Sequence, residues 1–225
     1  MPVSILNSYI SMPNSRDRLD LTNIQLGTEL WLIHSSLAVY RVIGLNAGAI
    51  PRADGFFGFA QSQSLSAVAL GLGKVFEREQ PGGYELCSVG GVYRLAKAAQ
   101  IQDNAAAAAF VRRYEVTPSA DWVCDVDQVF SRQRPRILDR MQVIDRVRNT
   151  RLAHIQQMAP DGTLPSIAAF QELLAFAFDF HAFVNEAFLS VHPHPTLNDT
   201  QVESSLLHVL KMIGVTDPRS QFLDI

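Results

Sequence analysis

Apolar side chains recur at helical spacing along most of the chain, and this periodicity is the strongest constraint on the fold. The clearest stripe steps alternately by four and three residues and consists of Leu26, Leu30, Ile33, Leu37 and Tyr40. Residues 166–190 are apolar on almost every side and must pack against several neighbours. No stretch of any length alternates as a strand does. The pattern therefore predicts an all-α bundle of about six to eight helices.

Polar and turn-forming residues predict where the domain and its helices begin. Residues 1–18 contain Pro13 and are expected to form an irregular N-terminal segment. Residues 19–225 are expected to form one helical domain, with Asp20 or Thr22 as the first N-cap.

The middle of the chain contains further predicted helices and breaks. Glycines and prolines indicate a loop over 46–58, followed by a second helix over about 59–79. Gly71, inside that helix, is expected to permit close helix packing. Glu77, Arg78 and Glu79 would form its solvated end. Further expected helix starts are at Ser88, at Asn104 and near Pro118 or Ser119, with a last helix over about 199–213.

Composition limits the class of protein. The chain has 225 residues, of which 48% are hydrophobic and 18% charged, which is typical of a globular protein. Its net charge of −3 excludes a basic coat for nucleic acid, so any RNA site must be a local patch. Cys87 and Cys124 are far apart and form no CxxC, which indicates reduced thiols in a cytosol. The N-terminus lacks a basic region, and the uncharged stretch 55–73 holds glycines and amides, so a cytoplasmic protein without a membrane span is predicted.

A central helix, predicted to begin near Pro135, breaks its own pattern. At about 100° per residue, its apolar stripe consists of Ile137, Met141, Ile144, Leu152 and Ile155. Arg148 falls in the centre of that stripe, where an arginine is rarely buried unless it is paired. Asn149 and His154 lie on its two flanks. Such a break in the pattern is expected where a functional site lies.

The spacing of these residues resembles a known signature. Arg148-Asn149, four further residues and then His154 are similar to the Arg-polar-x(4–6)-His motif of HEPN domains. The order of segments also resembles the abortive-infection U-type branch of HEPN proteins, over about two thirds of the chain. The corresponding pieces are 31–45, 64–76, 148–154 and 170–188.

This resemblance implies a function. Many HEPN proteins are metal-independent endoribonucleases of prokaryotic defence or toxin–antitoxin systems, and they are typically dimers. His154 would move protons, Arg148 would hold the phosphate, and Asn149 would orient the histidine or the phosphate. No metal or cofactor would be needed. Arg148 and His154 lie about 120° apart on an ideal helix, so the two motifs would meet across a two-fold axis. The tyrosine that some HEPN toxins carry two residues after the histidine is here Gln156, which puts control by modification of that tyrosine in doubt.

Arginines surround this segment, although the protein as a whole is acidic. They are Arg132, Arg134, Arg136, Arg140, Arg146 and Arg151. Of these, Arg136, Arg146 and Arg151 are the expected contacts to an RNA backbone. The alternative is a solvated helix face paired with carboxylates such as Asp139 and Asp145.

Two further alternatives concern the function itself. Arg148 could pair with Asp145 and have a structural role. The fold could also have lost catalysis and bind RNA, a nucleotide or a protein partner such as an antitoxin. His192 and His194 have prolines between and after them and no nearby cysteine or carboxylate, so no metal site is predicted there.

Overall fold

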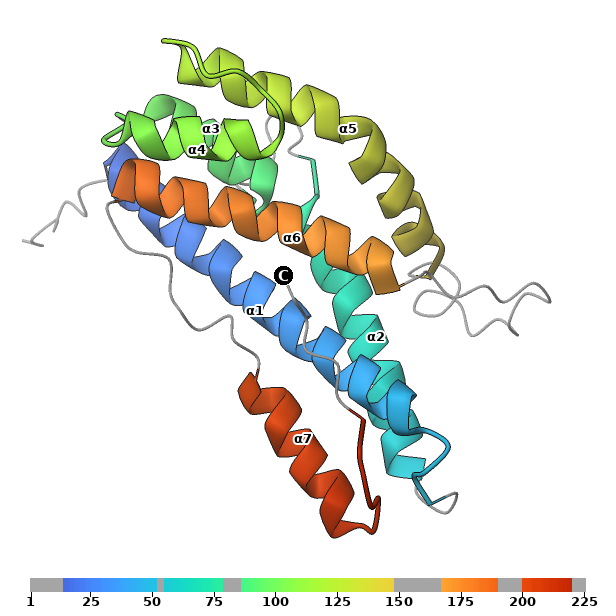
Figure 1. Ribbon diagram of the computed structural model, residues 1–225. Helices are drawn as coiled ribbons and strands as arrows, with labels where there is room; N and C mark the ends of the chain where they lie inside the picture. The colour runs from blue at the N-terminus through green and yellow to red at the C-terminus, as the bar shows by residue number, and fades with distance from the viewer. Residues whose placement is uncertain (1–13, 52–54, 79–85, 148–166, 190–199, 220–225) are drawn as a thin grey trace, which may run out of the picture.

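The computed structural model describes residues 14–51, 55–78, 86–147, 167–189 and 200–219. Within these ranges the chain forms seven α-helices and one π-helical segment, and no strand (Figure 1). The elements are α1 (Ser15–Asn46), α2 (Gly55–Val75), α3 (Val89–Ala98), α4 (Asn104–Arg113), α5 (Trp122–Val147), α6 (Ile167–Val184), η2 (Asn185–Leu189) and α7 (Thr200–Met212). The predicted all-α bundle of six to eight helices is confirmed.

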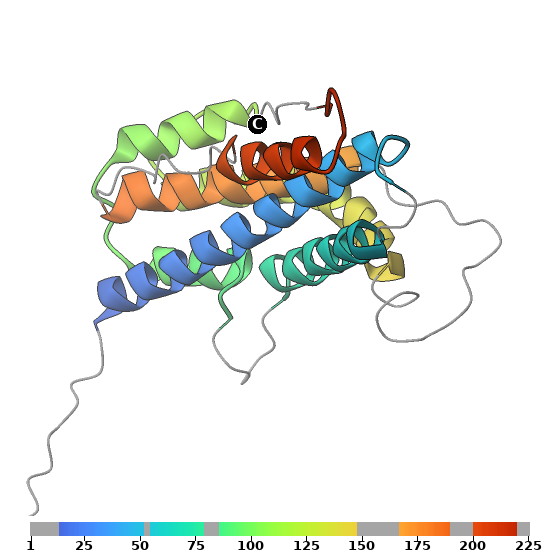
Figure 2. The same ribbon diagram turned by 90° about the horizontal axis from the view of Figure 1, so that it is seen from below.

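The long helix α1 is the axis of the bundle, and α2, α3, α6 and α7 all pack against it. Figure 2 shows α2 and α7 on opposite sides of its C-terminal half. The predicted stripe faces inward, since Leu26, Leu30 and Leu37 are fully buried and Ile33 almost so. Tyr40 is partly buried against the same core. The periodicity of the sequence was therefore a sound guide to the buried face of α1.

The start of α1 differs from the prediction. The helix begins at Ser15, so residues 15–18 are helical rather than irregular, and neither Asp20 nor Thr22 is the N-cap. The N-cap is Asn14, whose Oδ1 accepts a hydrogen bond from the Asp17 N–H at 2.9 Å. An asparagine cap with an acidic residue in the first turn satisfies the free N–H groups and the helix dipole. Residues 1–13 lie outside the described ranges.

The second helix also begins earlier than predicted, at Gly55 instead of about residue 59. Its first turn is held by Phe57, which is buried in a small cluster with Val42 and Ile43 of α1 and Leu210 of α7. This contact to α7 outweighs the glycines that had suggested a loop. Near the other end of α2, a Cβ on Gly71 would meet the Ile33 side chain, so the predicted close packing is confirmed.

Helix α6 forms the centre of the main core, as its composition predicts. Phe170, Phe180 and Phe183 are buried; the Phe183 ring stacks on Phe110 of α4 at a centroid distance of 4.8 Å. Within the described part of the chain, the segment Ile167–Leu189 is the one stretch long and apolar enough to cross a membrane. Here it lies inside the bundle, between α1, α4 and α5 (Figure 1).

Capping of the middle helices is mostly as predicted. Ser88 is the N-cap of α3, and its hydroxyl accepts from the Gly91 N–H at 3.2 Å. Helix α4 begins at Asn104, as predicted, and its N-cap is Asp103, whose carboxylate accepts hydrogen bonds from the N–H groups of Ala105 and Ala106. Helix α7 spans Thr200–Met212, close to the predicted range.

Candidate functional site

Helix α5 carries the basic region and leads directly to the predicted motif. Asp121 begins it, because its Oδ1 accepts hydrogen bonds from the N–H groups of Val123 at 3.0 Å and Cys124 at 3.1 Å. Asp125, buried in the first turn, accepts from the backbone N–H and the hydroxyl of Ser119 at 2.7 and 2.8 Å. These bonds fix the direction in which α5 leaves the preceding turn.

The prediction that a separate helix begins near Pro135 is wrong. One helix runs from Trp122 to Val147 with Pro135 inside it. A proline within a helix removes one hydrogen bond and commonly bends it without ending it. Figure 1 shows α5 changing direction along its length. The basic region and the start of the apolar stripe therefore share one helix.

The central motif itself falls outside the described ranges. Arg148, Asn149, Arg151 and His154 belong to 148–166, as do Leu152 and Ile155, while His192 and His194 belong to 190–199. The described half of the stripe is as predicted. Ile137 and Met141 are partly buried against the core, and Ile144 is fully buried. The described part of α5 thus keeps its apolar face inward as far as Ile144.

The described arginines of α5 fall into two groups. Two are engaged by the protein: Arg132 Nη1 donates to the Glu115 carbonyl at 2.5 Å, and Arg140 Nε donates to Glu172 of α6 at 2.9 Å. The Glu172 hydrogen bond and charge raise the pKa of Arg140. Arg140 also contacts Asp139, as the alternative of a paired helix face predicts. These contacts join α5 to its neighbours and leave the two side chains less available to a ligand.

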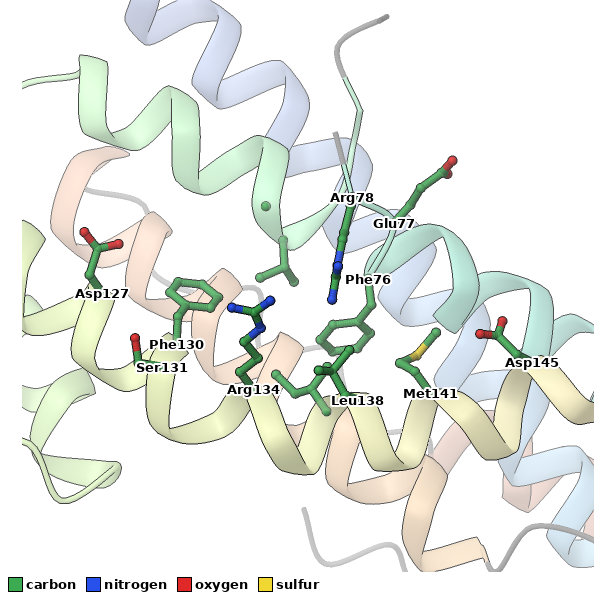
Figure 3. Close-up of a pocket in the computed structure, with 13 residues that line it drawn as sticks. Phe76, Glu77, Arg78, Asp127, Phe130, Ser131, Arg134, Leu138, Met141 and Asp145 are labelled. Atoms are coloured by element: carbon green, nitrogen blue, oxygen red, sulfur yellow. The ribbon is translucent and has the colours of Figure 1, made fainter. Parts of the chain in front are cut away.

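The second group is exposed to solvent. It includes Arg136 and Arg146, two of the predicted RNA contacts, although Arg146 also interacts with another group of the protein. Among the described residues, Arg136 forms no ion pair. Arg134, between the two engaged arginines, is also exposed and projects into a groove (Figure 3).

This groove has a volume of about 780 Å³ and lies between α5, the end of α2 and the start of α3. It is lined by Phe76, Glu77, Arg78, Val89, Gly90, Asp127, Phe130, Ser131, Arg134, Ile137, Leu138, Met141 and Asp145. Figure 3 shows the guanidinium groups of Arg78 and Arg134 directed into the same space. Within the described ranges neither of them forms an ion pair or a hydrogen bond. The centre of the groove is therefore cationic.

Three carboxylates line the groove, and that of Glu77, next to Arg78 in sequence, is directed away from the two guanidinium groups in Figure 3. Asp127 and Asp145 flank the two arginines in Figure 3. The Asp127 charge is already engaged, because it accepts from Lys97 Nζ at 2.9 Å and from the Tyr93 hydroxyl at 3.0 Å. Burial and this hydrogen bond raise the pKa of Tyr93, so the phenol keeps its proton and donates. Asp127 thus offers little to offset the guanidinium pair.

The groove also has an apolar wall. Phe130 packs against Tyr93 at 4.8 Å between ring centroids, and Phe76 stacks on Phe176 at 6.4 Å. Leu138 is 39% exposed, while Ile137 and Met141 are partly buried beside it. Cations above an apolar wall suit a ligand that is anionic at one end and flat or apolar at the other. The sequence alone assigned Arg78 to a solvated helix end, because nothing in its own segment indicates that it meets Arg134.

A second polar cluster lies inside the bundle, where α6 becomes η2. Asn23 of α1 donates through Nδ2 to Oδ1 of Asn185 at 2.8 Å, and Asn185 Nδ2 lies 3.3 Å from Nδ1 of His181. Burial lowers the pKa of His181, partly offset by a hydrogen bond with the Asn23 backbone. The cluster joins α1 to the central helix, and its imidazole is held neutral.

Among the residues that the structure describes, no group of three or more His, Cys, Asp or Glu side chains could hold a metal ion. Cys87 and Cys124 form no disulfide, and the Cys87 thiol donates a hydrogen bond to Gln25 Oε1 at 2.6 Å. Comparison with family models, with curated proteins and with solved structures found no match to this chain.

Proposed function

We propose that the protein is a metal-independent endoribonuclease of a prokaryotic defence or toxin–antitoxin system, acting in the cytoplasm as a homodimer. The observation that carries the proposal is the course of α5. The described part of this helix presents exposed Arg136 and Arg146 and extends to Val147, the residue that precedes the sequence Arg148-Asn149…His154. The similarity of that sequence to the HEPN motif, within an all-α bundle, supports the same reading.

The reaction in this proposal is transesterification of RNA. The 2′-hydroxyl attacks the adjacent phosphorus, the bond from phosphorus to the 5′-oxygen breaks, and a 2′,3′-cyclic phosphate forms. His154 moves the protons, from the attacking 2′-hydroxyl and to the departing 5′-oxygen, since an imidazole has a pKa near working pH. Arg148 stabilises the extra negative charge of the transition state, and Asn149 orients the histidine or the phosphate. Arg136, Arg146 and Arg151 contact the RNA backbone, and an antitoxin protein would be the partner that restrains the enzyme.

The second candidate is a catalytically inactive module of the same fold that binds RNA, a nucleotide or a protein partner. The groove beside α5 favours it, because paired guanidinium groups over an apolar wall can bind a ligand without any chemistry. The two candidates differ in whether the motif residues are needed for turnover.

Cleavage of total cellular RNA in excess EDTA tests the proposal. The wild type should cleave, and Arg148→Ala and His154→Ala should each lose about 100-fold or more of that activity, because each removes a group used in the transition state. Arg112→Ala, on the exposed side of α4, is the matched control and should cleave as the wild type does. Circular dichroism would check that each variant is folded. Equal cleavage by the wild type and both motif variants would exclude this mechanism and leave the binding module.

A further inference from the structure

We propose that the groove between α5 and the end of α2 binds a short single-stranded RNA segment, with Arg78 and Arg134 on a phosphate and a base against the apolar wall. None of the residues that line this groove belongs to the HEPN-like motif. The inference rests on the proposed function only for the identity of the ligand as RNA. Its location and chemistry rest on the groove itself.

The two guanidinium groups of the groove are arranged to bind an anion. Arg78 and Arg134 come from different elements and direct two like charges into one space (Figure 3). An anion between the two guanidinium groups would offset their repulsion, and within the described chain no carboxylate forms an ion pair with either of them. Two guanidinium groups offer planar sets of donors that match the oxygens of a phosphate. The hydroxyl of Ser131, on the same wall, adds a further donor.

The apolar wall calls for more than a bare phosphate. Leu138 and Met141 line the groove on the side of α5, and the rings of Phe76 and Phe130 complete the apolar wall. A nucleobase has flat apolar faces that pack on such surfaces, and unpaired bases of single strands are free to do so. A duplex holds its bases stacked inside and could offer only its backbone. The volume of about 780 Å³ exceeds what a single phosphate needs.

The position of the groove suggests the path of the strand. Its lining on α5 extends from Asp127 to Asp145, and Asp145 precedes Arg148 by three residues. Arg134 to Asp145 alone spans about 16 Å of helix. A strand lying there would run along α5 toward the residues proposed to cleave it. The groove would then select single-stranded substrate before any chemistry occurs.

A binding assay that excludes cleavage tests this inference. The probe is a fluorescein-labelled 2′-O-methyl RNA dodecamer, which lacks the attacking hydroxyl, titrated in EDTA and followed by anisotropy. Arg78→Ala with Arg134→Ala should weaken binding about tenfold or more, and the slope of log affinity against log salt should fall by about 0.7 per arginine. Leu138→Glu should also weaken binding, through repulsion of phosphate and loss of the wall. Arg112→Ala, outside the groove, should bind as the wild type does.

The remaining arms separate the possible results. All four substituted side chains are exposed, so the variants should fold, and circular dichroism would verify this. A matching duplex should bind more weakly than the single strand. Unchanged binding by the double arginine variant would overturn the inference, and so would displacement of the probe by AMP at a similar concentration, which would indicate a free mononucleotide. If the groove variants bind the probe more weakly but the wild type does not cleave total cellular RNA in EDTA, this site is upheld and the endoribonuclease is rejected. If the wild type cleaves that RNA but the groove variants bind the probe as the wild type does, the endoribonuclease is upheld and this site is rejected.

Discussion

At the scale of single residues, the polar cluster of buried Asn23 and Asn185 with the partly buried His181 makes the stability of the bundle dependent on pH. Its amides are bonded to each other, and His181 lies against Gly27 of α1, where a Cβ would be only 2.6 Å from Nε2. Such a site accepts a neutral imidazole and resists a charged one, because burial penalises the cation. His181 therefore couples the packing of α1 and α6 to pH.

This coupling has a definite sign. The folded protein holds the pKa of His181 below its ordinary value near 6.5, so as pH falls through that value the unfolded chain takes up a proton first. Acidification from pH 7.5 to 5.5 should lower the free energy of unfolding of the wild type more than that of His181→Gln, measured by urea unfolding. His208→Gln, on the exposed face of α7, is the control variant. The same acidification should lower its free energy of unfolding by as much as that of the wild type. Parallel losses in wild type and His181→Gln would contradict this account.

At the scale of elements, α1 and α2 depend on close approach. The apolar stripe of α1 packs against α2. In this interface Gly71 of α2 faces Ile33 of α1. Three further side chains of α2 are fully buried there, namely Leu65, Val68 and Leu72. Helix propensity alone would favour alanine over glycine at any position in α2. Packing reverses that preference at Gly71, since the position opposite a β-branched side chain leaves no room.

Two glycines of α2 provide a matched test. Gly71→Ala should lower the free energy of unfolding by about 1–3 kcal/mol, because the added methyl meets the Ile33 side chain. Gly58→Ala, where nothing lies within 4 Å, should leave stability unchanged or raise it by up to about 1 kcal/mol. Chemical unfolding of both variants measures the difference. A stabilised Gly71→Ala would mean that α1 and α2 are less closely packed than described.

At the scale of the whole molecule, the proposed catalytic pair requires two chains. On an ideal helix, Arg148 and His154 would lie about 120° apart, which is too wide for both to reach one phosphate easily. In the proposed homodimer, a two-fold axis would bring the arginine of one protomer to the histidine of its partner. The shared site would also explain an arginine within an apolar stripe, since the stripe beyond Ile144 would then belong to an interface.

Mixing the two inactive variants tests this arrangement. In a mixed dimer of Arg148→Ala and His154→Ala protomers, one of the two shared sites retains both residues. An equimolar mixture, exchanged by brief dilution, should therefore recover about a quarter of the wild-type cleavage rate, while each variant alone stays inactive. Sedimentation of the wild type should give about twice the chain mass of 24.9 kDa. A mixture as inactive as its components would place each site within one chain.

Much of the fold could be predicted because helices are encoded locally. The buried face of α1, the cap at Ser88 and the apolar character of α6 all follow from residues within a turn or two of each other. Errors arose where local signals competed. Asn14 rather than Asp20 is the N-cap of α1, Phe57 anchors the first turn of α2 through its contact with α7, and Pro135 lies inside a helix that it was expected to begin.

The sequence by itself determined which faces of the helices are apolar and that arginines gather on α5, since both are properties of residues close together in the chain. Only the tertiary structure decided which arginines are engaged and which meet a groove. Arg140 forms an ion pair with Glu172, whereas Arg78 and Arg134 line the same groove. Each of these pairs joins segments far apart in sequence. Such meetings depend on how the helices turn back and pack on one another, which periodicity within one helix does not encode.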